Sequence, residues 1–313
     1  MIQINILAHK EERFNFTLKS LEFLNKIKEN NKEKIKIVIC FSNFNNLENW
    51  ENVINNLNKN NIKSEILYIK NRGLNYMEKI NTLINSDCEY SCSMDDDIFI
   101  TNDLWDYIIE NINILEDEDN LFLAPLISNG IPSVDLFIND FFNDNDKQEI
   151  NNIFKKTKIE NMWGVDYSSL NYEKENWNMD FYENVNKINH HYKGIHPVRV
   201  SLDAHKKIAD IICNNKENFL KNKNYYIEKF KLPYFCNSFY FIKTSTWKNI
   251  INDKTLFKDE FDEVPLNLYR EKNDLNMIFV RNGFCLHMAY NTIGLENQNN
   301  IEQFYQENFI NKI

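Results

Sequence analysis

The stretch that decides the fold is EYSCSMDDDIFIT, residues 89–101. A short apolar-leaning run predicts a buried strand, which leads into Asp95, Asp96 and Asp97 before a second apolar run begins. Adjacent carboxylates repel one another, and a divalent cation removes that repulsion. The alternative is an acidic N-cap for the helix that TNDLW (101–105) predicts, but one acid would be enough for that. The triplet therefore favours a cation site at the end of a strand.

Strand-like and helical patterns alternate on the N-terminal side of this stretch. Strands are predicted at 2–8, 35–41, 62–69 and 89–94, and helices at 46–59, at 75–86 and around a first apolar face of Leu18, Leu21, Leu24 and Ile27. This order predicts a parallel sheet flanked by helices. Ligands of such sheets bind outside the carboxyl ends of the strands, which is where the aspartate triplet lies.

The alternation ends after a predicted strand at 121–128. Residues 130–232 are polar, aromatic and irregular, and we expect an insertion or a second lobe there. Strand and helix signals return in the last third of the chain. They predict a strand and then a helix in 238–250, a helix in 261–274, and a strand that runs into a polar loop in 277–291.

Composition excludes several classes of protein. The 313 residues carry a net charge of -10, which weighs against broad binding to nucleic acid, and 14% aromatic residues weigh against disorder. No run of 18 apolar residues exists, so we expect no membrane span. The start, MIQINILAHKEER, does not resemble a signal peptide, and we expect a cytoplasmic protein. The six cysteines form no CxxC pair, which predicts free thiols rather than disulfides or a zinc site.

Residues 71–100, NRGLNYMEKINTLINSDCEYSCSMDDDIFI, resemble the nucleotide-sugar-binding core of GT-A glycosyltransferases, especially those of family 2. The features that match are Gly73, Lys79, Asn81, the pair Glu89–Tyr90, and a DxD motif in Asp95–Asp97. The resemblance covers about the first 125 residues and implies a GT-A fold, a Rossmann-like α/β fold with a mainly parallel sheet flanked by helices. It implies a nucleotide-sugar-binding half at 1–128 and an acceptor-binding half at 129–313, whose insertion at about 130–235 completes a single domain.

The resemblance also implies an activity. A sugar would move from a nucleotide diphosphate sugar, with UDP-sugars expected, to an acceptor hydroxyl, with inversion and with Mn²⁺ or Mg²⁺ as cofactor. Asp97 would bind the metal, and Asp95 would lie near the donor and the metal. The implied donor-binding residues are Ala8, His9, Glu11, Asn43, Gly73, Lys79, Asp95 and Asp96. Asn43 stands where family 2 enzymes often have an acid, which leaves the donor base open.

Further candidates lie late in the chain, each with a structural alternative. His287, at the end of an apolar strand, is either a core residue or a further metal ligand of the kind that many GT-A enzymes have. Asp262 and Glu263 begin a helix, where they suit the helix dipole, or one of them is the catalytic base, with Asp262 favoured. The residues proposed to contact the acceptor or a phosphate, or else to be structural, are His196, Arg199 and Trp163.

Two other classes of function stay open. A nucleotidyltransferase typically needs a glycine-rich phosphate loop near the first strand, and ILAHKEERF contains no glycine. A sugar-binding or cation-binding module could keep the acids without the chemistry. A narrower form of the main hypothesis has a modified base in DNA as the acceptor, against which the acidic charge weighs. The sequence identifies neither the sugar nor the acceptor.

Overall fold

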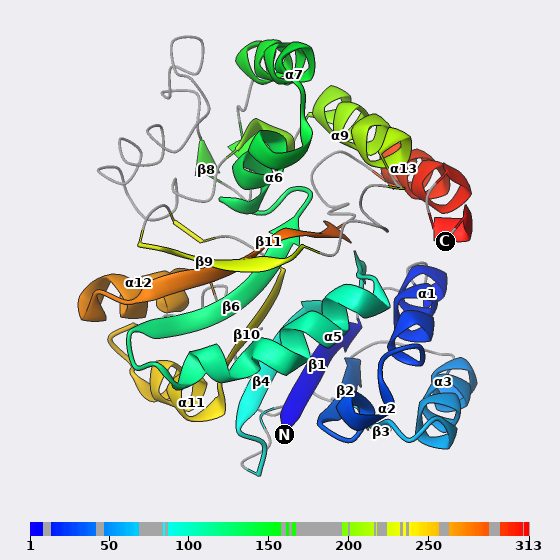
Figure 1. Cartoon of the computed structure of the whole chain (residues 1–313), viewed down its shortest axis with the longest axis vertical. Helices are drawn as coiled ribbons and strands as arrows, with labels where there is room; N and C mark the ends of the chain where they lie inside the picture. The colour runs from blue at the N-terminus through cyan, green and yellow to red at the C-terminus, as the bar shows by residue number, and fades with distance from the viewer. Residues whose placement is uncertain are drawn as a thin grey trace. The chain divides into compact units, whose positions relative to one another are not determined.

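The structure is a computed structural model of the 313-residue chain (Figure 1). It describes residues 1–8, 14–41, 47–68, 84, 87–157, 161–162, 165–166, 196–199, 201–215, 217, 224–231, 234–235, 238–256, 263–287, 295–308 and 310–312.

Nine strands form one sheet in the order β3-β2-β1-β4-β10-β6-β11-β5, with β9 paired to β11. Their bounds are β1 Ile2–Ala8, β2 Ile35–Phe41, β3 Lys63–Tyr68, β4 Tyr90–Asp95, β5 Ile98–Phe99, β6 Asn120–Ile127, β9 Tyr226–Phe230, β10 Phe239–Lys243 and β11 Asn276–His287. The strands β3, β2, β1 and β4 run parallel. The late strand β10 is antiparallel to both of its neighbours, β4 and β6.

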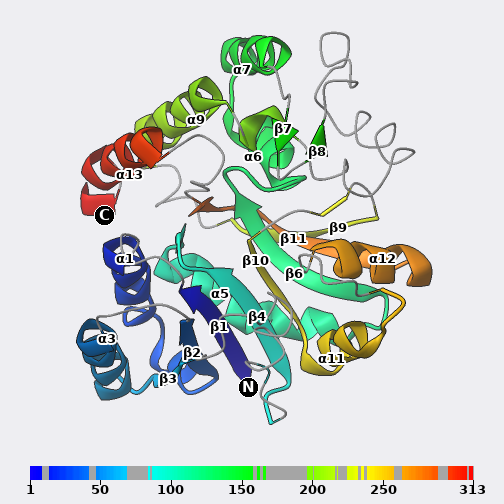
Figure 2. The same ribbon diagram turned by 180° about the vertical axis from the view of Figure 1, so that it is seen from behind.

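The chain divides into two compact units. The first comprises Met1–Pro125, Ile227–Lys231 and Ser238–Val280. Its helices are α1 Phe14–Leu24, α2 Glu29–Lys32, α3 Leu47–Lys59, α5 Asn102–Asn111, α11 Thr244–Asn252, α12 Glu263–Asn273 and the 3-10 helix η2 Ile112–Glu116. Figures 1 and 2, which view the chain from opposite sides, both show α5 lying along β4.

The strand β1 is buried along its whole length. Ile2, Ile4 and Ile6 supply an apolar face, and Gln3 and Asn5 alternate with them on the other. The amide of Gln3 donates to Asn5 Oδ1 (2.8 Å), and Asn5 Nδ2 donates to the carbonyl of Cys92 in β4 (3.1 Å). Because these polar side chains are hydrogen-bonded, β1 can lie at the centre of a sheet that is covered on both faces.

The strand β10 shows how helices cover both faces of the sheet. Phe239 and Phe241 contact the ring of Trp105 in α5, at centroid distances of 5.3 and 6.0 Å. Tyr240, which lies between them in sequence, contacts Trp247 in α11 at 6.1 Å. Since successive side chains of a strand point to opposite faces, α5 and α11 pack on opposite sides of β10. The expected α/β fold, with a sheet flanked by helices, is confirmed.

The second unit comprises Leu126–Tyr226, Leu232–Asn237 and Arg281–Ile313. Its helices are α6 Ser133–Phe141, α7 Asp144–Lys156, α9 Leu202–Asn214, α13 Leu295–Asn308 and the 3-10 helices η4 Pro197–Arg199 and η5 Ile310–Lys312, and β7 Asn161–Met162 pairs with β8 Val165–Asp166. Both views show α9 beside α13. Lys207 of α9 joins α7 through Asp146 and Glu149, both at 2.7 Å.

The strand predictions agree with the structure at 2–8 and 35–41, and within one residue at 62–69, 89–94 and 121–128. Two expectations need correction. The region 130–232 is not irregular throughout, because the amphipathic segments α6, α7 and α9 lie in it. The first helix ends at Leu24, so Ile27 does not belong to its apolar face. Ile27 is buried, but it lies in the turn that follows the helix. The helix expected at 75–86 lies outside the described residues, apart from residue 84.

Five of the six cysteines lie in the described part of the chain, and none of these five forms a disulfide there: Cys40, Cys88, Cys92, Cys213 and Cys285. No helix in the described ranges combines the length and the apolar character needed to cross a membrane.

Candidate metal centre

The aspartate triplet forms the end of β4 and the turn that follows it. The backbone N–H of Asp95 donates to the carbonyl of Ser238, just before β10, at 3.1 Å. The hydroxyl of Thr17 in α1 donates to the carbonyl of Asp96. The turn is therefore held both by the neighbouring strand segment and by a helix.

The triplet does not cap a helix. Helix α5 begins at Asn102, its N-cap residue is Thr101, and the acid of its first turn is Asp103. The alternative in which the triplet serves as an N-cap is therefore wrong, because the helix starts too far along the chain.

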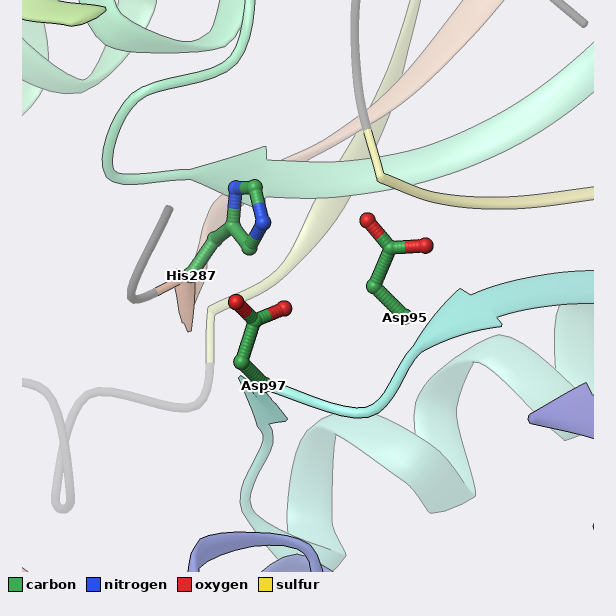
Figure 3. A group of neighbouring side chains, drawn as sticks. All are labelled: Asp95, Asp97 and His287. Carbon is green, nitrogen blue, oxygen red and sulfur yellow. The ribbon is translucent and has the colours of Figure 1, made fainter. Parts of the chain in front are cut away.

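Asp95 and Asp97 meet His287, the last residue of β11 (Figure 3). Each of the three side chains offers one ligand atom, and these atoms lie within 4.8 Å of one another. The side chains of Asp97 and His287 are buried, and that of Asp95 is half-buried. Three residues that the sequence predicts as ligands thus come together from positions 95, 97 and 287.

The donor set fits a divalent cation. Two carboxylates this close repel each other, and burial of Asp97 strengthens the repulsion because less water screens it. Carboxylate oxygens suit Mg²⁺ and Mn²⁺, whereas imidazole nitrogen suits the transition metals. A set of two carboxylates and one imidazole therefore suits Mn²⁺ better than Mg²⁺.

Sequence reasoning missed the residues that surround His287. Ser128 and Asn129 follow β6 directly, and both are buried. Asn129 Oδ1 lies 2.8 Å from His287 Nδ1, and Asn129 Nδ2 donates to the His287 carbonyl at 3.1 Å. In the sequence the pair lies in LISNG (126–130), directly after a buried strand, a pattern that is also typical of an ordinary turn.

A second histidine, His205 in α9, is buried close enough to His287 for the two to interact electrostatically. Burial, and then the charge of His287, lower the pKa of His205 in α9 to about 4, and a hydrogen bond with the backbone of Val198 opposes the shift. His205 is therefore a neutral side chain at physiological pH.

The other predicted residues are placed in part. Ala8 ends β1, and Glu263 is the first residue of α12, with Pro265 in the first turn as expected. His196 is fully buried, accepts the N–H of Val198 at Nδ1 (3.0 Å) and packs edge-on against Phe154. For Arg199 the structure describes the backbone, within η4. The predicted residues outside the described ranges are His9, Glu11, Asn43, Gly73, Lys79, Asn81, Trp163 and Asp262.

No protein-family model matches the chain, and no curated protein matches its sequence. Several solved structures show partial likeness. S. aureus TarS 1-349 matches over 40% of this chain and 35% of that chain, with 10% identity and a TM-score of 0.32. The mannosyltransferase PcManGT from Pyrobaculum calidifontis, in complex with GDP-Man and Mn²⁺, matches over 39% and 34%, with 11% identity and a TM-score of 0.31. GalNAc-T7 with UDP, GalNAc and Mn²⁺ matches over 98% and 48%, with 9% identity and a TM-score of 0.47.

The chain thus spans about a third of the TarS fragment and of the mannosyltransferase, and about half of the GalNAc-T7 chain. Likeness at this level does not identify a function.

Proposed function

We propose that the chain is a metal-dependent glycosyltransferase of the GT-A class. It transfers a sugar from a nucleotide diphosphate sugar, with a UDP-sugar as the expected donor, to an acceptor hydroxyl. The observation that carries the proposal is the cluster of Asp95, Asp97 and His287 at the carboxyl end of β4. The DxD motif and its lead-in at 71–100, which resemble the donor site of this class, support the same assignment.

The cluster gives the proposed chemistry a physical basis. A nucleotide diphosphate is strongly anionic, and this chain carries a net charge of -10. A donor can therefore approach the carboxylates only if a cation is bound there. The proposed ligands are Asp95, Asp97 and His287, and the cation, when bound, supplies Lewis-acid stabilisation of the diphosphate that leaves.

The proposal assigns the acceptor side to the start of α12. An inverting transfer is a single displacement, so the acceptor hydroxyl loses its proton as it attacks the sugar. Asp262 is the proposed base, and Glu263, which opens the helix, holds the acceptor or stabilises the helix N-terminus. The proposal places Asp262, rather than Glu263, toward the donor.

Thermal unfolding with nucleotides tests the proposal. UDP or GDP together with Mn²⁺ should raise the unfolding midpoint of the wild-type chain more than either component alone, since ligands that bind the native state stabilise it. Asp97→Asn should keep the fold but lose this joint shift and the Mn²⁺-dependent transfer of sugar.

Asp103→Asn is the matched control, because Asp103 is an acid of the same region that lies in the first turn of α5 and outside the cluster. It should behave as the wild type does. Turnover in Asp97→Asn at the wild-type rate would remove the metal assignment, and nucleotide binding without any sugar transfer would favour a binding module.

A further inference from the structure

Asn129 contacts both the backbone and the ring of His287. It is fully buried in the second unit, directly after β6, and His287 ends β11. The amide Nδ2 lies 3.1 Å from the carbonyl oxygen of His287, and Oδ1 lies 2.8 Å from the ring Nδ1. One side chain therefore holds two parts of one proposed ligand.

The chemistry of these two contacts determines which way the amide points. A backbone carbonyl can only accept a hydrogen bond, so the atom of Asn129 that faces it must be the NH₂ group. The opposite orientation would place two acceptor oxygens against each other. The amide oxygen of Asn129 must then face the ring of His287.

The same logic determines the tautomer of His287. An amide oxygen only accepts, so the Nδ1 atom that faces it must carry the hydrogen. In a neutral imidazole the lone pair then lies on Nε2. Nε2 is thereby the atom that can coordinate a cation shared with Asp95 and Asp97.

Ser128 holds the same residue by its backbone alone. Its hydroxyl lies 3.2 Å from the His287 N–H and 3.4 Å from the His287 carbonyl. The backbone N–H of Ser128 also donates to the carbonyl of Cys285 in β11 (3.2 Å). Substitutions of Ser128 and Asn129 can therefore distinguish support of the strand end from contact with the ring. Both residues hydrogen-bond the backbone of His287, and of the two, Asn129 also contacts the ring.

We infer that Asn129 is a positioning residue, which keeps His287 in the Nδ1–H tautomer and presents Nε2 to the cation. The inference rests on the proposed function for the identity of the cation. Partners that orient a metal-bound histidine typically contribute about 10- to 100-fold to metal affinity. The role differs from that of a metal ligand, because Asn129 acts through His287.

The first test needs no metal. Nitrogen-15 NMR of the histidine side chains in the metal-free protein at pH 8 should show His287 as the Nδ1–H tautomer. Asn129→Leu, which is similar in size and cannot accept a hydrogen bond, should shift His287 toward the Nε2–H tautomer. Asn129→Asp keeps an acceptor oxygen toward the ring but places a second one against the His287 carbonyl, so it should keep the Nδ1–H signal and lower the stability of the strand end. Ser128→Ala should leave the signal unchanged.

The second test measures Mn²⁺ binding with UDP present, by electron paramagnetic resonance of the free ion. Asn129→Leu should bind Mn²⁺ about 10- to 100-fold more weakly, and Ser128→Ala should stay close to the wild type. The inference is overturned if Asn129→Leu keeps the Nδ1–H tautomer, or if both variants lose affinity equally, which would indicate support of the strand alone. Failure of the wild type to bind Mn²⁺ would count against the proposed function, whereas the tautomer signal tests Asn129 separately.

Discussion

At the scale of single residues, the candidate metal centre combines two carboxylates with a neutral amide that contacts His287. Asp95 and Asp97 bring two carboxylates, and His287 brings an imidazole, the proposed third ligand, whose tautomer we infer Asn129 to determine. The cluster and the contact of Asn129 with His287 both depend on residues far apart in sequence. Asn129 and His287, for example, are 158 positions apart.

The assignment of the base is also a matter of single residues. Asp262→Asn should leave donor binding intact and reduce turnover by about 100-fold or more, the scale expected when a general base is lost. The measurement is the rate of sugar transfer at saturating Mn²⁺ and donor, with Glu263→Gln as the neighbouring control. Proton NMR of the product should show an inverted anomeric centre, and a retained configuration would contradict the assignment of Asp262.

The buried His205 predicts how stability depends on pH. Its pKa falls from an ordinary value near 6.5 to about 4 in the folded chain, mainly because burial disfavours the charged ring. In the described part of the chain, Nε2 of His205 has no hydrogen-bond partner to hold a second proton. Below pH 6.5 the unfolded chain therefore takes up a proton that the folded chain does not, and stability falls between pH 6.5 and 4.

Urea unfolding of the metal-free chain at a series of pH values measures this effect. The contribution of His205 should be on the order of 3 kcal/mol between pH 6.5 and 4, and His205→Leu should make the pH dependence shallower by that amount. An identical pH dependence in the variant would show that other groups cause the loss of stability.

At the scale of elements, an aromatic side chain of α5 packs against β10. Trp105 is fully buried against Phe239 and Phe241. Its indole N–H has no hydrogen-bond partner among the residues that the structure describes. The stabilisation by Trp105 therefore comes from packing rather than from a hydrogen bond.

Two substitutions of Trp105 distinguish the contribution of packing from that of the indole N–H. Trp105→Ala leaves a large cavity and should lower the free energy of unfolding by about 3–5 kcal/mol. Trp105→Phe keeps most of the contact and loses an N–H that had no partner, so it should cost about 1–2 kcal/mol. Urea unfolding of the two variants tests this order, and equal losses would mean that the N–H contributes as well.

At the scale of the whole molecule, features that depend on neighbouring residues could be predicted from the sequence, and features that depend on sequence-distant contacts could not. The strand β1 could be predicted from its own residues because IQINILA is rich in aliphatic and β-branched residues, which favour a buried strand. The acids at 95–97 could be predicted as a candidate site because they follow a predicted strand, and ligands of parallel sheets bind outside the carboxyl ends of the strands. The second partner of β4 could not be predicted in this way, since β10 comes from much later in the chain.

The same limit explains the parts of the centre that were missed. His287 carried a local signal, a histidine at the end of an apolar strand, and so it could be named as a candidate. Asn129 carried no such signal, because SNG after a strand is also an ordinary turn. Only the pairing of sequence-distant strands shows that the end of β6 reaches the end of β11.

The antiparallel strand β10 also determines when the free edge of β4 can be covered during synthesis on the ribosome. Ser91 of β4 and Thr244, which follows β10, share a hydrogen bond of 2.8 Å across 153 positions. At about 5–20 residues per second, the edge of β4 waits on the order of ten seconds for its neighbour. An unpaired strand edge is a template for association with other chains. The nascent chain therefore has to protect this edge, which ends at Asp95, until β10 emerges.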